Sequence, residues 1–231
     1  MLKLSIIIPV LNEAETIVQT LAALASLRGR GAEVIVVNGG SRDGTAERAA
    51  PQADRVIVAP RGRALQMNAG AAEARGDILL FLHADTTLPD NADALLFEGL
   101  RDPVWQWGRF DVAISGRSLL LPAVAWLMNW RSLATGIATG DQAMFMRRTA
   151  FDAVGGFPNL PLMEDIAMSK RLKRLSRPLC LAARVTTSGR RWDRNGAVRT
   201  ILLMWRLRLT FWLGASPESL ARRYGVAPRD G

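Results

Sequence analysis

The chain has 231 residues, a length at which one domain can bury a large hydrophobic core. Hydrophobic residues make up 49% of it and charged residues 22%, which excludes a disordered or low-complexity chain. One cysteine, Cys180, and one histidine, His83, exclude an internal disulfide and a Cys/His zinc cluster. A lone cysteine favours a reducing compartment, so we expect a cytoplasmic protein.

The formal net charge is +9, and it is unevenly distributed. Residues 1–146 carry 13 Lys and Arg against 15 Asp and Glu, whereas residues 147–231 carry 17 against 6. This C-terminal excess favours a polyanion or an anionic membrane surface as partner, although solubility alone would tolerate it. The first residues do not resemble a secretory signal, and no apolar run reaches the roughly 20 residues of a membrane-spanning helix.

The first half of the chain alternates β-branched runs with helical patterns, which predicts βαβ units around a parallel sheet. We expect strands at residues 4–9, 33–37, 54–58 and 77–82, the last almost purely apolar and therefore central. Asn12 and Glu15 have capping-box spacing, which predicts a helix from there to about Leu27. A second helix is expected at residues 63–75.

The pattern loosens beyond residue 100, without a repeat or a proline-rich linker. Helices are expected at residues 90–100, 164–175 and 196–213, and strands at 144–146 and 179–185. Residues 105–114 alternate like an exposed strand, and residues 119–133 predict an apolar helix or a hairpin. We therefore expect a single domain over residues 1–231.

Polar residues follow four of the predicted strands, at the carboxyl ends where open parallel sheets bind ligands. They are Asn12 and Glu13, residues 38–45, Arg61 and Arg63, and residues 83–86. Each group taken alone can be a loop or a helix cap. Together at one sheet edge, they predict a nucleotide pocket.

Four segments carry a resemblance to a known family: residues 5–13 (SIIIPVLNE), 36–45 (VVNGGSRDGT), 82–86 (LHADT) and 163–165 (MED). In this order they resemble the motifs of the inverting family 2 glycosyltransferases, over residues 3–192. The short length and the LHADT variant are similar to the small bacterial selenium/radical-SAM-associated transferase 2 group within that family.

The resemblance implies the GT-A fold, a Rossmann-like α/β fold with a mostly parallel central sheet flanked by helices. It divides the domain into a nucleotide-sugar-binding half at residues 1–100 and a smaller acceptor and catalytic half at 101–195. An amphipathic helical segment follows at residues 196–231.

The resemblance also implies a nucleotide-sugar donor, UDP- or GDP-linked. Pro9, Leu11 and Glu13 would line its base and ribose pocket, while Asn38 replaces the aspartate with which the family usually reads the base. The other implied donor contacts are Gly39, Asp43, Arg63, Ala84, Asp85, Asp141, Arg190, Arg191 and Trp192. The alternatives are a solvated helix start for Arg63 and surface ion pairs for Arg190 and Arg191. Residues 188–192 lack the glutamine of the motif of processive relatives, which argues against polymer synthesis.

Asp85 takes the last position of the family's Asp-x-Asp metal motif, and His83 replaces the first aspartate. The resemblance implies a divalent cation, Mg²⁺ or Mn²⁺, held by Asp85, His83 and the donor phosphates, with a packing histidine as the alternative for His83. Asp165 matches the family's base, which takes the proton of the acceptor hydroxyl. Glu164 would position the acceptor, although two acids at a helix start also favour its positive end without any catalytic role.

The implied function is inverting, metal-assisted transfer of one sugar to a hydroxyl acceptor. The alternatives are transfer to a polyprenyl phosphate at the inner face of the plasma membrane and a non-catalytic basic docking module. No RNP, zinc or helix-turn-helix signature favours nucleic acid. The 196–213 helix carries Ile201, Leu202, Trp205, Leu209 and Trp212 on one flank and Arg199, Arg206 and Arg208 toward another. That arrangement is typical of a membrane interface or of a core-facing helix with a solvated basic side. A homodimer is also open.

Overall fold

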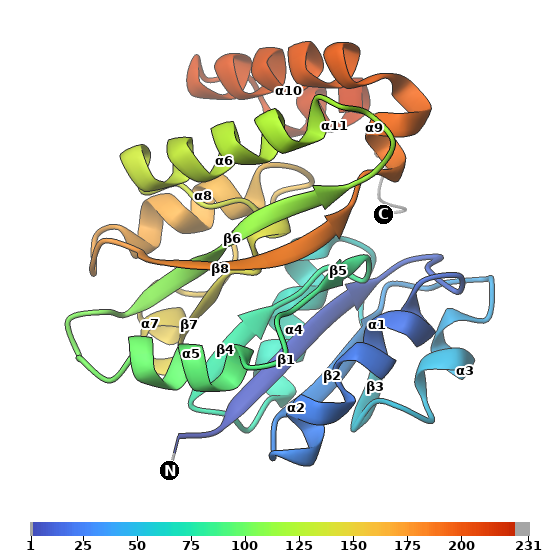
Figure 1. Cartoon of the computed structure of the whole chain (residues 1–231), viewed down its shortest axis with the longest axis vertical. Coiled ribbons are helices and arrows are strands. Elements are labelled where there is room, and N and C mark those ends of the chain that lie inside the picture. Colours follow the sequence, from blue (N-terminus) through green and yellow to red (C-terminus); the bar gives the residue numbers. More distant parts are fainter. Residues whose placement is uncertain (1, 225–231) are drawn as a thin grey trace.

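The computed structural model describes residues 2–224, without the side chains of Arg191, Asn195 and Ala197. The predicted donor contact of Arg191 and the last seven residues of the predicted 196–231 segment lie outside this description. Within it, one mixed sheet has the order β3–β2–β1–β4–β7–β6–β8–β5 (Figure 1). Its strands are β1 (Leu4–Val10), β2 (Glu33–Asn38), β3 (Arg55–Val58), β4 (Ile78–Phe81), β5 (Thr86–Thr87), β6 (Trp107–Ser115), β7 (Phe145–Arg147) and β8 (Leu179–Ser188).

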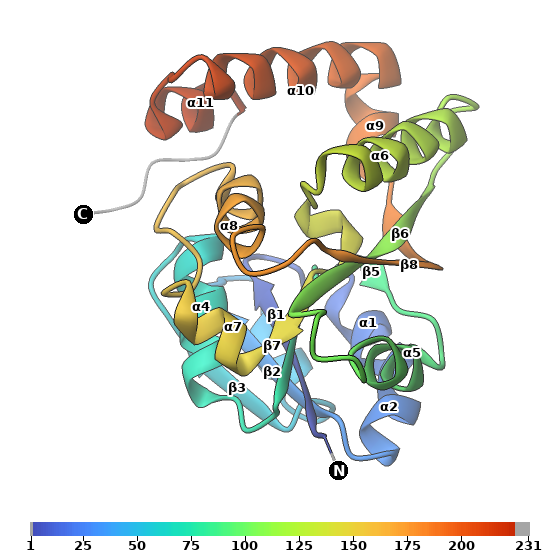
Figure 2. The same ribbon diagram turned by 90° about the vertical axis from the view of Figure 1, so that its left-hand side faces the viewer.

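Helices flank both faces of this sheet (Figure 2). They are α1 (Ile17–Ala23), α2 (Ala25–Gly29), α3 (Thr45–Ala49), α4 (Arg63–Glu73), α5 (Ala92–Gly99), α6 (Leu121–Thr135), α7 (Arg148–Ala153), α8 (Glu164–Leu172), α9 (Arg190–Asn195), α10 (Ala197–Trp212) and α11 (Pro217–Tyr224), with a short 3₁₀ turn, η1 (Gly140–Gln142). The α/β fold is as predicted, and of the residues 119–133 those from 121 onward form a helix, α6, and not a hairpin.

The four N-terminal strands β3, β2, β1 and β4 are parallel, which confirms the βαβ prediction for this half. Successive side chains of β1 enter different cores, since Ile6 and Ile8 pack on one face of the sheet and Ile7 on the other. All three are fully buried, because helices cover both faces. Parallel strands bring the polar residues after β1, β2 and β4 to the same edge.

Helix α4 is held close to β1 and β2 by a glycine. A Cβ on Gly70 would lie 2.5 Å from Cγ2 of Ile7 and 2.8 Å from Cγ2 of Val37. The close approach places Gln66 at the strand ends, where its Nε2 donates to the carbonyl oxygens of Val10 and Val37, both at 2.8 Å. The start of α4, at Arg63, is thereby fixed beside the carboxyl ends of the strands.

Two local predictions were wrong. The helix expected from Asn12 begins only at Ile17, and Leu24 divides it into α1 and α2. Asn12 has a φ of 55° and joins two loops. Its backbone N–H donates to Oγ of Ser41, and its side-chain Oδ1 accepts the backbone N–H of Arg42, both at 3.0 Å. A left-handed residue cannot cap this helix, and its side chain already has a partner elsewhere.

The strand expected to be exposed at 105–114 is also buried. β6 begins at Trp107, and Trp107, Arg109 and Phe110 are each at most 2% exposed. The strand lies between β7 and β8, and α6 packs on one of its faces. Alternation therefore reflects two different buried faces here and does not indicate contact with water.

Helices α6 and α10 lie at the end of the molecule opposite the N terminus (Figures 1 and 2). Leu207 of α10 packs with Leu162, Ile166 and Leu220 in a separate small core. By contrast, Trp205 is 62% exposed and Trp212 is 74% exposed, so of the two alternatives for this flank the core-facing one was wrong. No helix within residues 2–224 has the length and apolar character needed to cross a bilayer.

Candidate functional site

A cavity of about 1000 Å³ lies where the polar ends of β1 and β4 face the segments around α8, α9 and α10. Eleven of the predicted site residues line it: Pro9, Glu13, Arg63, His83, Ala84, Asp85, Asp141, Glu164, Asp165, Arg190 and Trp192. Asp85 and Asp165, which are far apart in the chain, therefore share one cavity. This convergence was the central expectation from the sequence.

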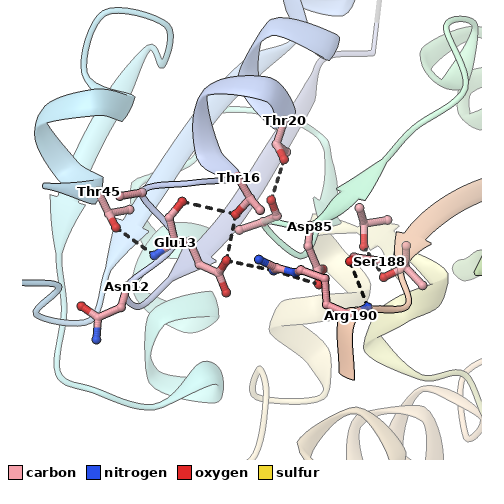
Figure 3. A network of polar contacts seen from close by, with 12 residues as sticks. Asn12, Glu13, Thr16, Thr20, Thr45, Asp85, Ser188 and Arg190 are labelled. Atoms are coloured by element: carbon pink, nitrogen blue, oxygen red, sulfur yellow. Dashed lines mark hydrogen bonds and ion pairs between the residues drawn. The ribbon is translucent and has the colours of Figure 1, made fainter. Parts of the chain in front are cut away.

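Arg190, which follows β8, contacts the ends of two other strands at one wall of the cavity (Figure 3). Its Nη2 lies 3.3 Å from Oε2 of Glu13, after β1, and 3.6 Å from Oδ2 of Asp85, after β4. Glu13 also accepts a hydrogen bond from Oγ1 of Thr16 at 2.8 Å. The Arg190 side chain is 52% exposed, so these ion pairs are weak and a ligand can replace them.

Four predicted donor contacts, Leu11, Asn38, Gly39 and Asp43, lie along the same sheet edge but do not line the cavity. Asn38 accepts the N–H of Ser41 through Oδ1 at 2.8 Å. A Cβ on Gly39 would lie 2.9 Å from Oε1 of Gln66, so a larger residue here would push the Gln66 amide away from Val10 and Val37. Their contacts with a nucleotide stay predictions.

Asp43 acts within the structure as the anchor of the loop that carries Glu13. It accepts hydrogen bonds from Thr45 and from the N–H of Ala14, and these lower the pKa of its carboxyl group. Thr45 in turn accepts the N–H of Glu13 through Oγ1 at 2.9 Å. The hydrogen bonds between the two loops therefore hold Glu13 in place before any ligand binds.

His83 faces Asp141 across the cavity. Its Nδ1 lies 3.2 Å from Oδ1 of Asp141, and its Nε2 is buried against Gly140 without a hydrogen-bond partner among the described residues. Burial acts to raise the pKa of Asp141, but the hydrogen bond from His83 and the positive charges of Arg63 and Arg208 lower it overall. Asp141 is therefore held as a carboxylate.

A metal site would need ligands from the substrate. Among residues 2–224 there is no group of three or more His, Cys, Asp or Glu side chains that could hold an ion. Asp85 presents one carboxylate to the cavity, with its side chain 28% exposed. Mg²⁺ commonly binds through one or two carboxylates together with phosphate oxygens, so this side chain fits such an ion once a diphosphate is present.

The two acids at the start of α8 have different surroundings. Glu164 is 2% exposed, and its Oε1 lies 3.1 Å from Nη1 of Arg63. Burial acts to lower the pKa of Arg63, but the negative charges of Glu164 and Asp165 outweigh it and raise that pKa. Asp165 accepts the N–H of Gly140 through Oδ2 at 2.9 Å and the N–H of Ile166 through Oδ1 at 2.7 Å. Two backbone N–H donors thus orient Asp165, whereas Glu164 forms an ion pair with Arg63.

Several residues of the site were not predicted from the sequence. Gln66, which ties β1 to β2, was hidden inside a helical pattern, and only its polarity on a buried helix face could have revealed it. Helices α10 and α11 contribute Thr200, Met204, Arg208 and Tyr224 to the cavity. Arg208 is one of three arginines in a largely apolar helix, and no pattern in the sequence separates it from Arg199 and Arg206.

The model of glycosyl transferase family 2 matches residues 5–154. The chain belongs to glycosyl transferase family 2. This family 2 chain is 28% identical over 201 residues to the probable glycosyltransferase YdaM of Bacillus subtilis, covering 75% of the chain and 47% of YdaM. It is 28% identical over 179 residues to poly-beta-1,6-N-acetyl-D-glucosamine synthase of Staphylococcus aureus, covering 70% of the chain and 43% of that relative. The chain thus spans less than half the length of these two relatives.

Solved structures share the fold of this family 2 chain. Mannosyltransferase PcManGT from Pyrobaculum calidifontis, in complex with GDP-Man and Mn²⁺, superposes with a TM-score of 0.65 at 22% identity, covering 99% of the chain and 64% of that structure. S. aureus TarS in complex with UDP-GlcNAc gives a TM-score of 0.63 at 19% identity, covering 80% and 58%. These likenesses confirm the GT-A fold predicted from the motifs.

Proposed function

We propose that the chain transfers one sugar from a nucleotide-sugar donor to an acceptor hydroxyl, with inversion and with Asp165 as general base. The observation that carries this proposal is that Asp85 and Asp165 line one cavity together with Arg63 and Arg190. Family membership and the GDP-Man and UDP-GlcNAc complexes of structural neighbours support a nucleotide-sugar donor. The proposed division of the domain places donor binding in residues 1–100 and the acceptor in residues 101–195.

On the donor side, Pro9 and Glu13 hold the nucleoside at the end of β1. Arg190 leaves its exposed contacts with Glu13 and Asp85 and binds the diphosphate, for which a planar guanidinium is well suited. Asp85 would hold Mg²⁺ or Mn²⁺ together with the diphosphate oxygens, while His83 orients Asp141. A bound cation of this kind offsets the negative charge that develops on the departing nucleoside diphosphate.

On the acceptor side, Asp165 takes the proton. Each of its oxygens accepts one backbone N–H, which leaves further lone pairs free for the acceptor hydroxyl. The hydroxyl oxygen forms a bond to the anomeric carbon, its proton moves to Asp165, and the anomeric C–O bond breaks with its electron pair leaving on the diphosphate. Glu164 is a positioning residue, since its ion pair holds Arg63 beside this carboxylate.

A second candidate is transfer to a polyprenyl phosphate at an anionic membrane surface. Of the seventeen large hydrophobic side chains that are exposed in the described residues, twelve lie at positions 119–133 and 198–213, in and beside α6 and α10. Residues 112–140 and 194–217 contain no Asp or Glu. Exposed tryptophans beside arginines suit the headgroup region of an anionic bilayer. A phosphate acceptor is already ionised, so this reaction would need no base.

The test is transfer by the full chain with a panel of UDP- and GDP-sugars, with and without Mn²⁺, in the wild type and in Asp165→Asn. Removing a general base should lower kcat by about 10²–10⁴-fold. Nucleoside diphosphate affinity, measured by calorimetry, should stay within about twofold, since Asp165 contacts the acceptor. Asp152→Asn, an exposed acid on α7, is the control.

Full turnover by Asp165→Asn with a soluble acceptor contradicts the base. If that variant keeps turnover only with a polyprenyl phosphate, and the protein sediments with anionic liposomes, the second candidate is correct. Failure of every nucleoside diphosphate to bind contradicts both candidates.

A further inference from the structure

Arg131 of α6 and Arg208 of α10 have buried nitrogen atoms without hydrogen-bond partners among the described residues. Nε and Nη2 of Arg131 and Nε of Arg208 are buried and make no hydrogen bond within the described residues. Leaving a buried donor unsatisfied costs about 1–3 kcal/mol, and more for a charged group. Native proteins keep few such groups, so each one needs an explanation.

The surroundings of Arg131 add a second unfavourable interaction. Burial first, and then the positive charges of Arg208 and Arg109, lower the pKa of Arg131 to about 10, while Asp165 acts in the opposite direction. The Arg131 guanidinium therefore stays charged at neutral pH, and the neighbouring positive charge of Arg208 acts against it. Two other arginines at the cavity do form ion pairs: Arg63 pairs with Glu164, and Arg190 pairs with Glu13.

Of these two arginines Arg208 lines the cavity together with Asp165, and Arg131 lies behind it, close enough to interact electrostatically with Arg208 and Asp165. The groups at the ends of β1 and β4, such as Glu13 and Asp85, are already bridged by Arg190. An anion held by Arg131 and Arg208 therefore lies beside the proposed base and belongs to the acceptor.

We propose that Arg131 and Arg208 form a subsite for a phosphoryl group on the acceptor. The inference rests on the proposed function, because it takes Asp165 as the residue that meets the acceptor. Three nitrogen atoms without partners match the several oxygens of a phosphoryl group, and its charge of nearly −2 balances two guanidinium groups. A buried charge pair of like sign is unfavourable without a ligand and becomes favourable when the anion binds.

The stability of a methionine variant distinguishes the subsite from a merely structural role of the two arginines. Arginines that hold the fold together would be paired, and replacing them by methionine would destabilise the protein. An unpaired buried guanidinium lowers stability, so Arg131→Met should leave the melting temperature of the ligand-free protein unchanged or raise it. Phosphate should then raise the melting temperature of the wild type but not that of Arg131→Met, because it binds the native state through both arginines.

The experiment titrates inorganic phosphate into the full chain by calorimetry, with and without saturating nucleoside diphosphate and Mn²⁺. Wild type should bind phosphate in both conditions, and Arg131→Met and Arg208→Met should each weaken binding at least tenfold. Arg206→Met removes an exposed arginine from the same helix and should bind as the wild type does. Arg208→Lys keeps the charge and should keep part of the affinity.

Two outcomes overturn the subsite: phosphate binding that is equal in Arg131→Met, Arg208→Met and Arg206→Met, or phosphate that competes with the nucleoside diphosphate. Nucleotide binding in the same titrations separates the proposals. Intact nucleotide binding with no phosphate binding overturns only the subsite. Phosphate binding that depends on both arginines, without binding of any nucleotide, overturns the proposed donor and leaves an anion site.

A phosphoryl group can come from a soluble phosphate ester or from a lipid phosphate, and transfer assays distinguish the two. One arm offers glycerol phosphate against glycerol, and the other offers a short polyprenyl phosphate in vesicles against the unphosphorylated alcohol. Whichever class of acceptor the protein uses, it should prefer the phosphorylated form at least tenfold. Arg131→Met and Arg208→Met should both lose that preference. Equal use of phosphorylated and unphosphorylated acceptors contradicts the proposal.

Discussion

The two sides of the cavity differ in how completely their polar groups are satisfied. On the side of β1 and β2, Thr45 accepts the backbone N–H of Glu13 (Figure 3), and Asp43 accepts hydrogen bonds from Thr45 and from the N–H of Ala14. On the side of α6 and α10, buried nitrogens of two arginines have no partner in the described residues. The first side is organised before a ligand arrives, whereas the second would be completed by the proposed phosphoryl group.

Breaking the ion pair between Arg63 and Glu164 should give the largest loss of stability, because Glu164 is buried. Arg63→Met leaves the 2% exposed Glu164 with an uncompensated charge. We expect the free energy of unfolding to fall by about 3 kcal/mol at neutral pH, the lower end of the range for buried pairs, because Arg63 itself is half exposed. Urea unfolding measures this, with exposed Arg61→Met as the control. An equal loss in both variants would mean that the ion pair contributes nothing specific.

Gly140 should give the next largest effect, because its backbone N–H orients Asp165 while its Cα faces His83. A Cβ there would lie 2.6 Å from Cε1 of His83, so Gly140→Ala must displace the imidazole from Asp141. Overpacking of this kind lowers the free energy of unfolding by about 1–3 kcal/mol. Thermal unfolding and transfer rates should both decline, and Gly29→Ala, with open space around it, should change neither. A tolerated Gly140→Ala would show that the His83 contact is dispensable.

The stability of Asp43→Asn as a function of pH tests the hydrogen bonds on the side of β1 and β2. Its pKa is lowered in the folded protein, mainly by the hydrogen bond from Thr45, so it stabilises the fold above its unfolded pKa of about 3.9. That stabilisation is lost as the pH falls through the folded pKa. Asp43→Asn should therefore be less stable than the wild type at pH 7, and the difference should shrink below about pH 4. Denaturant unfolding at a series of pH values measures this. A difference independent of pH would contradict it.

Arg190 should give the smallest stability effect. Its ion pairs with Glu13 and Asp85 are exposed, and such pairs contribute about 0–1 kcal/mol. Arg190→Met should leave the free energy of unfolding nearly unchanged but weaken nucleoside diphosphate binding several-fold in calorimetry. Arg199→Met, an exposed arginine on α10, is the control. Unchanged nucleotide affinity would remove Arg190 from the donor side.

Local patterns in the sequence determined the N-terminal half of the fold. β-branched runs and turn residues predicted β1 to β4, and the polar residues after them predicted the sheet edge at which the cavity lies. These signals are local, because strand periodicity and turn chemistry depend on neighbouring residues. The motif that ends at Asp165 also placed this acid correctly in the cavity, although it lies far from Asp85 in the chain.

Only the tertiary structure decided which faces are buried. The alternation of β6 predicted exposure, yet β7, β8 and α6 bury the strand. The apolar flank of α10 predicted a face for the core or for a membrane, yet its tryptophans lie outside while Arg208 lines the cavity. The burial of a side chain depends on elements that are distant in sequence, and a single helix pattern contains no information about them.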